Sequence, residues 1–171
     1  MTQKTTSNPA THKHILSVLV ENKAGVLSRV TGMISRRGFN INSLTVAPTE
    51  DVNLSRMTII VEADEVGFEQ ITKQLHKLVS VYKISDLTED DAIERELVLF
   101  KVQCTPERRH EIIEIANVFR ANIVDVGKNT LTVEATGTES KLDALENLFR
   151  AYGIRQLTRT GKIAMSRGHD Q

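Results

Sequence analysis

The sequence is short of the residues that build disulfides, cysteine metal clusters and aromatic stacking platforms. Its 171 residues include one cysteine, Cys104, no tryptophan, five phenylalanines and two tyrosines. A single cysteine excludes an intrachain disulfide and a cysteine-cluster metal site, which fits a cytoplasmic protein. So few aromatic side chains argue against an RNA-binding module, because single-strand binders stack bases on such rings.

The chain also lacks an excess of charge of one sign and an apolar run at its beginning. Lys plus Arg number 22 and Asp plus Glu number 22, so the formal net charge is zero. We therefore expect neither nucleic acid nor an anionic membrane as a partner. Residues 1–12 are polar and form neither a signal peptide nor a membrane span, and we predict that they and residues 166–171 are disordered tails.

What the sequence does contain is a strand followed directly by a turn and a helix. The apolar run Ile15 to Val20 predicts the strand, and Asn22 to Gly25 form the turn. The N–H groups of the first helical turn have no partners within the helix and suit a carboxylate. A glycine in such a turn is more often only a tight connection, so the local pattern alone favours that simpler interpretation.

The pattern of the first half predicts the order βαββαβ. The first helix carries Leu27, Val30 and Ile34 on its buried stripe, and Gly38 is placed to end it in the left-handed conformation. Further strands are predicted at 41–47, 54–62 and 81–87, and a second helix from Asp64 carries the stripe Phe68, Ile71, Leu75 and Leu78. This order is typical of a ferredoxin-like domain, an antiparallel sheet with two helices on one face.

The second half repeats the order after an acidic linker. Strands are predicted at 97–104, 123–126, 130–136 and 154–158. One helix has Thr105 as N-cap and a buried stripe of Ile112, Ile115 and Phe119, and the other has Thr138 as N-cap and a stripe of Leu142, Leu145, Leu148 and Phe149. The fold class is therefore α+β, with two tandem ferredoxin-like domains: 13–88, the linker 89–95, and 96–165.

No group of residues has the pattern of a catalytic or metal site. The five histidines, including His14 near the first tail, lack metal-ligand spacing and are expected at the surface or at caps. Asp90 and Asp91 lie in the predicted linker, where solvated charges are the expected role. The run Glu107 to His110 lies on a predicted solvent-facing helical turn. We therefore predict no catalytic residues and no metal ligands on this chain.

Several segments together carry a family resemblance. The chain resembles the small, regulatory subunits of acetolactate synthase (acetohydroxyacid synthase) from about His14 to Gly168. The likeness is strongest at Asn22, at 25–30, at 37–41, at 43–47, at 54–58 and at 74–78, and it continues at 119–120, 123–126, 137, 141–143 and 166–168.

The resemblance implies an N-terminal ACT domain, a C-terminal ACT-like domain, and no catalytic site. It implies that the chain activates a large catalytic subunit that uses thiamine diphosphate, Mg²⁺ and FAD, while carrying no cofactor itself. That subunit condenses two pyruvates, or pyruvate with 2-oxobutyrate, in branched-chain amino acid biosynthesis. Valine is the expected feedback inhibitor, and a homodimer formed through the ACT domain is the expected assembly.

The resemblance also implies where the effector binds, at the seam between two ACT domains. Matching positions supply a loop and the entrance of an opposing strand, namely Asn22, Lys23, Ala24, Gly25, Val26, Leu27, Asn40 and Ile41. Backbone N–H groups would hold the carboxylate, Asn22 or Asn40 would accept from the ammonium, and Ile41 or Val26 would line an aliphatic slot. Leucine or isoleucine stays open as the ligand.

Two rival functions belong to other classes. An effector-responsive module that controls transcription would need a basic helix or helix-turn-helix, and no third domain is available for one. A small enzyme would turn over pyruvate by itself, so an assay of the purified chain without the large subunit separates it from a regulatory subunit.

Overall fold

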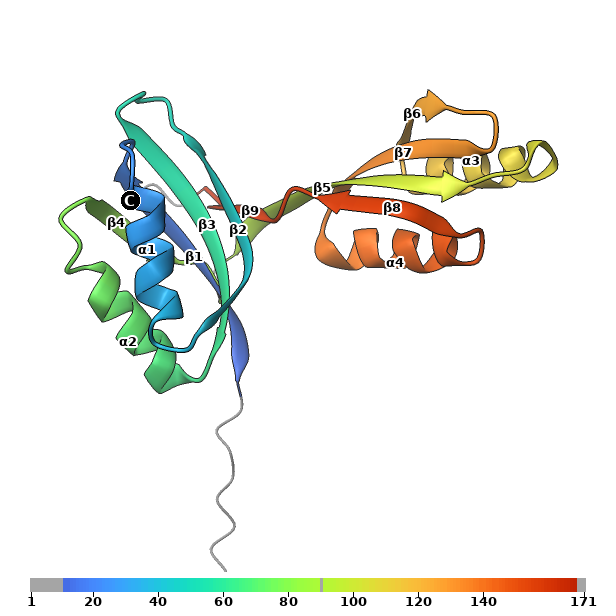
Figure 1. The fold of residues 1–171 in the computed structure, drawn as a ribbon. Coiled ribbons are helices and arrows are strands. Elements are labelled where there is room, and N and C mark those ends of the chain that lie inside the picture. Colours follow the sequence, from blue (N-terminus) through green and yellow to red (C-terminus); the bar gives the residue numbers. More distant parts are fainter. Residues whose placement is uncertain (1–10, 90, 169–171) are drawn as a thin grey trace, which may run out of the picture. The chain divides into compact units, whose positions relative to one another are not determined.

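The computed structural model describes residues 11–89 and 91–168 (Figure 1). Contacts divide the chain into two units. The first comprises residues 1–92 and 164–171, and the second comprises residues 93–163. The predicted tail at 1–12 lies mostly outside the described residues, as do Asp90 and the last three positions of the tail predicted at 166–171.

The first unit has the predicted order βαββαβ. Its elements are β1 (His12–Glu21), α1 (Val26–Ser35), β2 (Asn40–Pro48), β3 (Leu54–Ala63), α2 (Glu65–Leu75) and β4 (Val81–Asp86). The four strands form an antiparallel sheet in the order β2-β3-β1-β4, so that β2 and β4 are the edge strands of this path. The ferredoxin-like fold is confirmed.

Alternating residues of the sheet bury one face under both helices. Leu16 and Val18 of β1 and Ile59 of β3 are fully buried there against Val30 of α1 and Ile71 of α2. A strand turns successive side chains to opposite faces, so this alternation places the core between the sheet and the helices. Figure 1 shows α1 and α2 together on this side of the sheet.

Glycines in the left-handed conformation flank α1. Gly25 precedes the helix with φ of +83°, and Gly38 follows it with φ of +80°. Glycine alone takes this region without steric cost, which explains both ends of the helix. One member of the predicted apolar stripe is misplaced, because Leu27 is 39% exposed. It lies in the first turn beside Val26, whose side chain takes the buried position there.

A histidine expected at the surface lies inside the first unit. His14 is buried, and its ring stacks on Phe68 with 3.9 Å between centroids and 9° between planes. Its Nε2 lies 3.3 Å from the carbonyl oxygen of Ala63, whereas Nδ1 has no hydrogen-bond partner among the described residues. The prediction for His14 was wrong because β1 begins earlier than its apolar run and carries this side chain under α2.

The face of the first sheet that points away from its helices is partly covered. Ile15 and Ile60 on this face are buried in a small cluster with Leu87 and Ala164. Ala164 belongs to a short strand that the sequence did not predict, β9 (Ile163–Ser166), which also pairs with β5 (Ala92–Gln103). Ala164 thus packs with the first unit, although it follows the second unit in the chain.

The second unit repeats the arrangement. After β5 it contains η1 (Pro106–Arg108), α3 (Arg109–Val118), β6 (Asn122–Val126), β7 (Thr130–Gly137), α4 (Glu139–Arg150) and β8 (Ile154–Arg159). The strands follow the order β6-β7-β5-β8, and the core is built around the edge-to-face pair Phe100 and Phe149, with centroids 5.4 Å apart.

Local details of the second unit differ from the sequence-based prediction. The side chains of Thr105 and Thr138 make no N-cap hydrogen bond to the turns that they precede. Leu148 of the predicted stripe is 45% exposed. The run predicted to face solvent includes Arg109, whose guanidinium instead donates to the carbonyl oxygens of Gly127 and Lys128, each at 3.0 Å. Residues 92–95 of the predicted linker already belong to β5.

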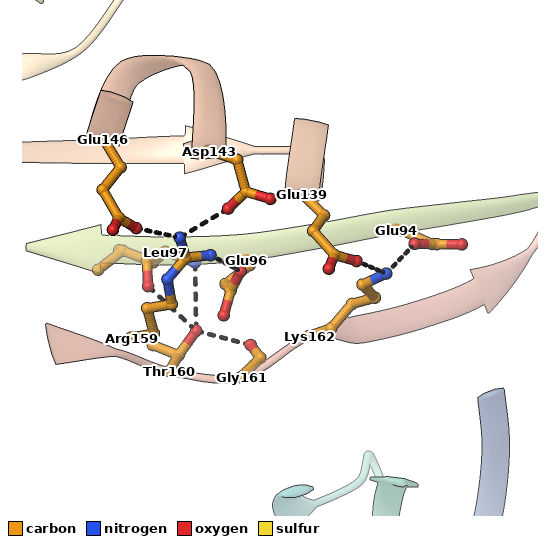
Figure 2. Close-up of polar contacts among 10 residues, drawn as sticks. All are labelled: Glu94, Glu96, Leu97, Glu139, Asp143, Glu146, Arg159, Thr160, Gly161 and Lys162. Carbon is orange, nitrogen blue, oxygen red and sulfur yellow. Dashed lines mark hydrogen bonds and ion pairs between the residues drawn. The ribbon is translucent and has the colours of Figure 1, made fainter. Parts of the chain in front are cut away.

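Arginine and lysine side chains tie strand β8 and the residues after it to α4 and β5 (Figure 2). Arg159 lies 3.0 Å from Glu96, 2.8 Å from Asp143 and 2.8 Å from Glu146. Burial opposes its charge, but hydrogen bonds to Glu146 and Asp143 outweigh that effect and raise the pKa of Arg159. The same arginine lowers the pKa of Glu146.

Lys162 makes a second such contact, at 2.7 Å from Glu94 and 3.0 Å from Glu139 (Figure 2). Here too burial opposes the charge, but the interactions with the two carboxylates outweigh the effect of burial and raise the pKa of Lys162. These clusters connect residues up to 68 positions apart in the chain, from Glu94 to Lys162.

None of the helices in the described part of the chain is both long and apolar enough to cross a membrane.

Candidate functional site

The predicted effector loop, residues 22–25, is tied to the turn between β2 and β3. The backbone N–H of Asn22 donates to the carbonyl oxygen of Asn53 at 2.7 Å, and Asn22 Nδ2 donates to that of Val52 at 2.8 Å. The preceding residue, Glu21, donates its N–H to Ser80 at 2.8 Å. The loop is therefore held in place on two sides, and among the described residues no hydrogen bond to the amide oxygen of Asn22 is found.

The N-terminus of α1 offers N–H groups that no side chain caps. Gly25 occupies the N-cap position and has no side chain, and no acidic residue lies in the first turn. The N–H of Val26 contacts the carbonyl oxygen of Lys23 at a long 3.3 Å. In contrast, Asp64 caps α2 through a 2.7 Å hydrogen bond from the N–H of Gly67. The positive end of α1 is thus open to an anion.

The one cation of the loop is already engaged. Lys23 forms an ion pair with Glu21, and the hydrogen bond between them raises the pKa of the Lys23 ammonium. Its side chain is largely exposed. Because Glu21 compensates this charge, attraction for a carboxylate at the loop rests mainly on the backbone N–H groups and the helix dipole.

The apolar members of the predicted site divide between core and surface. The side chain of Val26 is buried in the core of the first unit, so it cannot line a slot for an effector. Leu27 is partly exposed beside the loop, and Ile41 is partly buried against the core. Ala24 and Gly25 are exposed and leave the loop open. The aliphatic surface near the loop is therefore that of Leu27 rather than Val26.

The two halves of the predicted site lie at opposite ends of the sheet. Glu21, just before the loop, pairs in register with Leu54 of β3, whereas Asn40 pairs with Glu62 of the same strand. Leu54 and Glu62 are eight residues apart, which corresponds to about 26 Å at about 3.3 Å per residue. One chain therefore does not bring Asn40 and Ile41 to the loop.

Sequence reasoning missed the ties that hold the loop. It named Asn22 as a ligand-contacting residue but gave no indication that its amide nitrogen is bonded to the β2–β3 turn. No local signal could have revealed this contact, because it joins residues 30 positions apart. The described residues contain no group of three or more His, Cys, Asp or Glu side chains arranged to hold a metal ion.

Two family models match the chain, one for each half. A model described as "AHAS small subunit-like ACT domain" matches residues 16–83, and one described as "Small subunit of acetolactate synthase" matches residues 95–168. Together they span both units.

Curated proteins and a crystal structure resemble the whole chain. A probable acetolactate synthase small subunit from Archaeoglobus fulgidus is 55% identical, over 92% of this chain and 98% of that protein. The acetolactate synthase small subunit from Mycolicibacterium smegmatis is 52% identical, over 92% of this chain and 93% of that protein. The acetolactate synthase small subunit from Thermotoga maritima, known from a crystal structure, is 40% identical in sequence. Its structure matches with a TM-score of 0.84, over 93% of this chain and 99% of that chain.

Proposed function

The chain belongs to the family of acetolactate synthase small subunits, and on that premise we propose that it activates a catalytic large subunit and makes it sensitive to valine. The large subunit would carry thiamine diphosphate, Mg²⁺ and FAD and would condense pyruvate with pyruvate or with 2-oxobutyrate. The small subunit would contribute no catalytic group. Its role would be to sense a product of the branched-chain amino acid pathway.

The observation that carries the proposal is the uncapped N-terminus of α1. It combines Gly25 in the left-handed conformation, a first turn without acidic residues, and a loop fixed by the bonds of Asn22. An α-carboxylate would be bound by first-turn N–H groups, and the ammonium would meet the amide oxygen of Asn22 or of Asn40. A branched aliphatic side chain would contact Leu27 and Ile41, and no charged group is needed for it.

The separation of the two half-sites supports a dimer. β2 is an edge strand, so a second copy could pair with it in antiparallel orientation about a two-fold axis. The beginning of β2 in one chain, with Asn40, would then lie beside the end of β2 in the other. That end of the sheet carries the loop 22–25, because Pro48 pairs with Ser55 and Ser55 with Val20. Each dimer would therefore contain two composite sites, each built from both chains.

Feedback then follows from a difference in affinity. If valine binds one arrangement of the dimer more tightly and the catalytic subunit prefers another, each ligand lowers the affinity for the other. A coupling of about 1–3 kcal/mol is typical and corresponds to a change of about 5- to 150-fold.

The test is reconstitution with the purified large subunit. We expect acetolactate formation to rise when the small subunit is added and to fall again when valine is added. Titration calorimetry of valine into the small subunit alone should give one valine per chain, since a dimer would hold two sites. Turnover of pyruvate by the small subunit alone, or equal activity with and without it, would contradict the proposal.

A further inference from the structure

The first unit has a groove that the effector site does not use. It lies between α2 and β4, at the edge of the sheet opposite β2, and has a volume of about 560 Å³. Leu16, Phe68 and Ile84 are among the residues that line it. None of the effector-loop residues contributes to it.

The floor of the groove is apolar and held in place. Leu16 is fully buried in the sheet, and Phe68 and Ile84 are partly buried against the same core. The ring of Phe68 is fixed from below by its stacking on His14. The hydroxyl of Thr72, which also lines the groove, donates to the carbonyl oxygen of Phe68 one helical turn earlier at 3.1 Å. A ligand would therefore meet a preformed apolar surface.

The rim of the groove is negatively charged. Glu65 and Glu69 on α2 and Asp86 at the end of β4 line it, all three are exposed, and no lysine, arginine or histidine of the described residues does so. Glu69 has an ion pair with Lys73 at 2.6 Å, but both side chains are more than 60% exposed, so the pair is weak. Three carboxylates around one groove attract a cation and repel an anionic effector.

An apolar floor beneath a carboxylate rim has the chemistry that a long basic side chain complements. Lysine and arginine bury their aliphatic stems against apolar surface and keep the charged head at the edge. A free amino acid such as valine carries its own carboxylate and would be disfavoured here. The complementary ligand is a basic side chain whose backbone is held outside the groove, as in a protein segment.

We propose that this groove receives a segment of the catalytic subunit that bears Lys or Arg, with the aliphatic stem on Phe68 and Ile84 and the charged head among Glu65, Glu69 and Asp86. The proposal rests on the regulatory function proposed above. It separates the surface that docks the catalytic subunit from the loop proposed to bind valine. The groove lies where Leu16 pairs with Asp86, whereas the loop follows Glu21 toward the other end of the same strands, beside Ser80.

The experiment titrates the purified large subunit with small-subunit variants and records the concentration that gives half-maximal activation. The variants are Glu65→Gln/Glu69→Gln and the charge reversal Glu65→Lys/Glu69→Lys. The matched control Glu107→Gln/Glu114→Gln removes two exposed carboxylates from the second unit. We expect the neutral variant to raise the concentration about tenfold, the reversed variant to raise it further, and the control to leave it unchanged. Raising the salt concentration should weaken the wild type more than the neutral variant.

Three results would overturn the proposal. In the first, both variants reach half-maximal activation at the same concentration as the wild type. The groove would then not dock the catalytic subunit, but the proposed function would stand, because the wild type still activates. In the second, the variants change the mass of the small-subunit oligomer in sedimentation while activation is unchanged. A second copy of this chain would then occupy the groove. In the third, the wild type itself fails to bind or activate the large subunit, and the proposed function falls as well.

Discussion

Gly25 and Gly38 have nearly the same backbone φ, +83° and +80°, on either side of α1. A Cβ atom added to either would meet no atom within 4 Å. Replacing each glycine by the same residue therefore imposes a similar backbone strain, of about 1–2 kcal/mol, without a clash. Only Gly25 lies at the end of the helix where the effector carboxylate is proposed to bind.

This pair gives a controlled test of the effector loop. Gly25→Asp should raise the valine concentration that inhibits the reconstituted enzyme by more than about tenfold, because like charges would then lie close together. Gly38→Asp should lower stability by a similar amount and leave valine inhibition unchanged. Equal valine sensitivity of the two variants in the activity assay would mean that the effector binds elsewhere.

A second prediction concerns the composite site across the dimer. Asn40→Ala should weaken valine binding, because it removes a polar partner of the ammonium. Chains with Gly25→Asp and chains with Asn40→Ala would each form dimers with two defective sites. Mixed dimers would have one intact site, so random mixing should restore about a quarter of the wild-type sites. Calorimetry of the co-refolded mixture measures this number, and no recovery would indicate that each site lies within one chain.

The cap of α2 allows a stability prediction. Asp64→Ala removes the side-chain oxygen that accepts from Gly67 and should lower the free energy of unfolding by about 1 kcal/mol. Thr138 occupies the same position before α4 but makes no such bond, so Thr138→Ala should cost less. Urea unfolding of the two variants measures the difference. A loss as large for Thr138→Ala as for Asp64→Ala would contradict the role of the cap.

The Arg159 cluster predicts a dependence of stability on pH. Arg159→Met should destabilise the second unit by about 2 kcal/mol at neutral pH, because the carboxylates of Glu96, Asp143 and Glu146 lose a charged partner. The folded-state pKa of Glu146 is lowered, so its contribution is present above its unfolded pKa and disappears as the pH falls through the folded pKa. The loss of stability caused by Arg159→Met should therefore become smaller as the pH is lowered.

Thermal unfolding between neutral and acidic pH checks this sign. Arg155→Met is the matched control, because Arg155 lies on the same strand but is exposed. We expect its effect to be small at every pH. A deficit of Arg159→Met that grew as the pH fell would contradict the assignment of the stabilisation to ionised carboxylates.

Local patterns in the sequence were sufficient for the order of strands and helices. Apolar residues at strand and helix spacing predicted both βαββαβ repeats, and the position of Gly38 predicted the end of α1. These features depend on neighbouring residues, whose spacing is visible in the chain itself. The unpredicted β9 is only four residues long, so it presents too short a pattern to be recognised.

The arrangement of distant residues was not accessible in the same way. His14 stacks on Phe68, although 54 positions separate them in the chain. Arg159 donates a hydrogen bond to Glu96, although 63 positions separate these two residues. Such contacts depend on which strands pair and in which register, and neither follows from local spacing. The exposure of Leu27 likewise depends on which side of the first turn of α1 faces the core, where Val26 is buried instead.

The sequence by itself determined that this chain has a strand, a glycine turn and a helix, followed by a second strand predicted from Ile41, with Asn40 just before it. The tertiary structure alone decided that these two segments lie at opposite ends of one sheet, about 26 Å apart by the strand rise. The physical reason is the antiparallel register of β1, β3 and β2, which puts the start of β2 at the far end from the loop. A site built from both segments therefore requires a second copy of the chain.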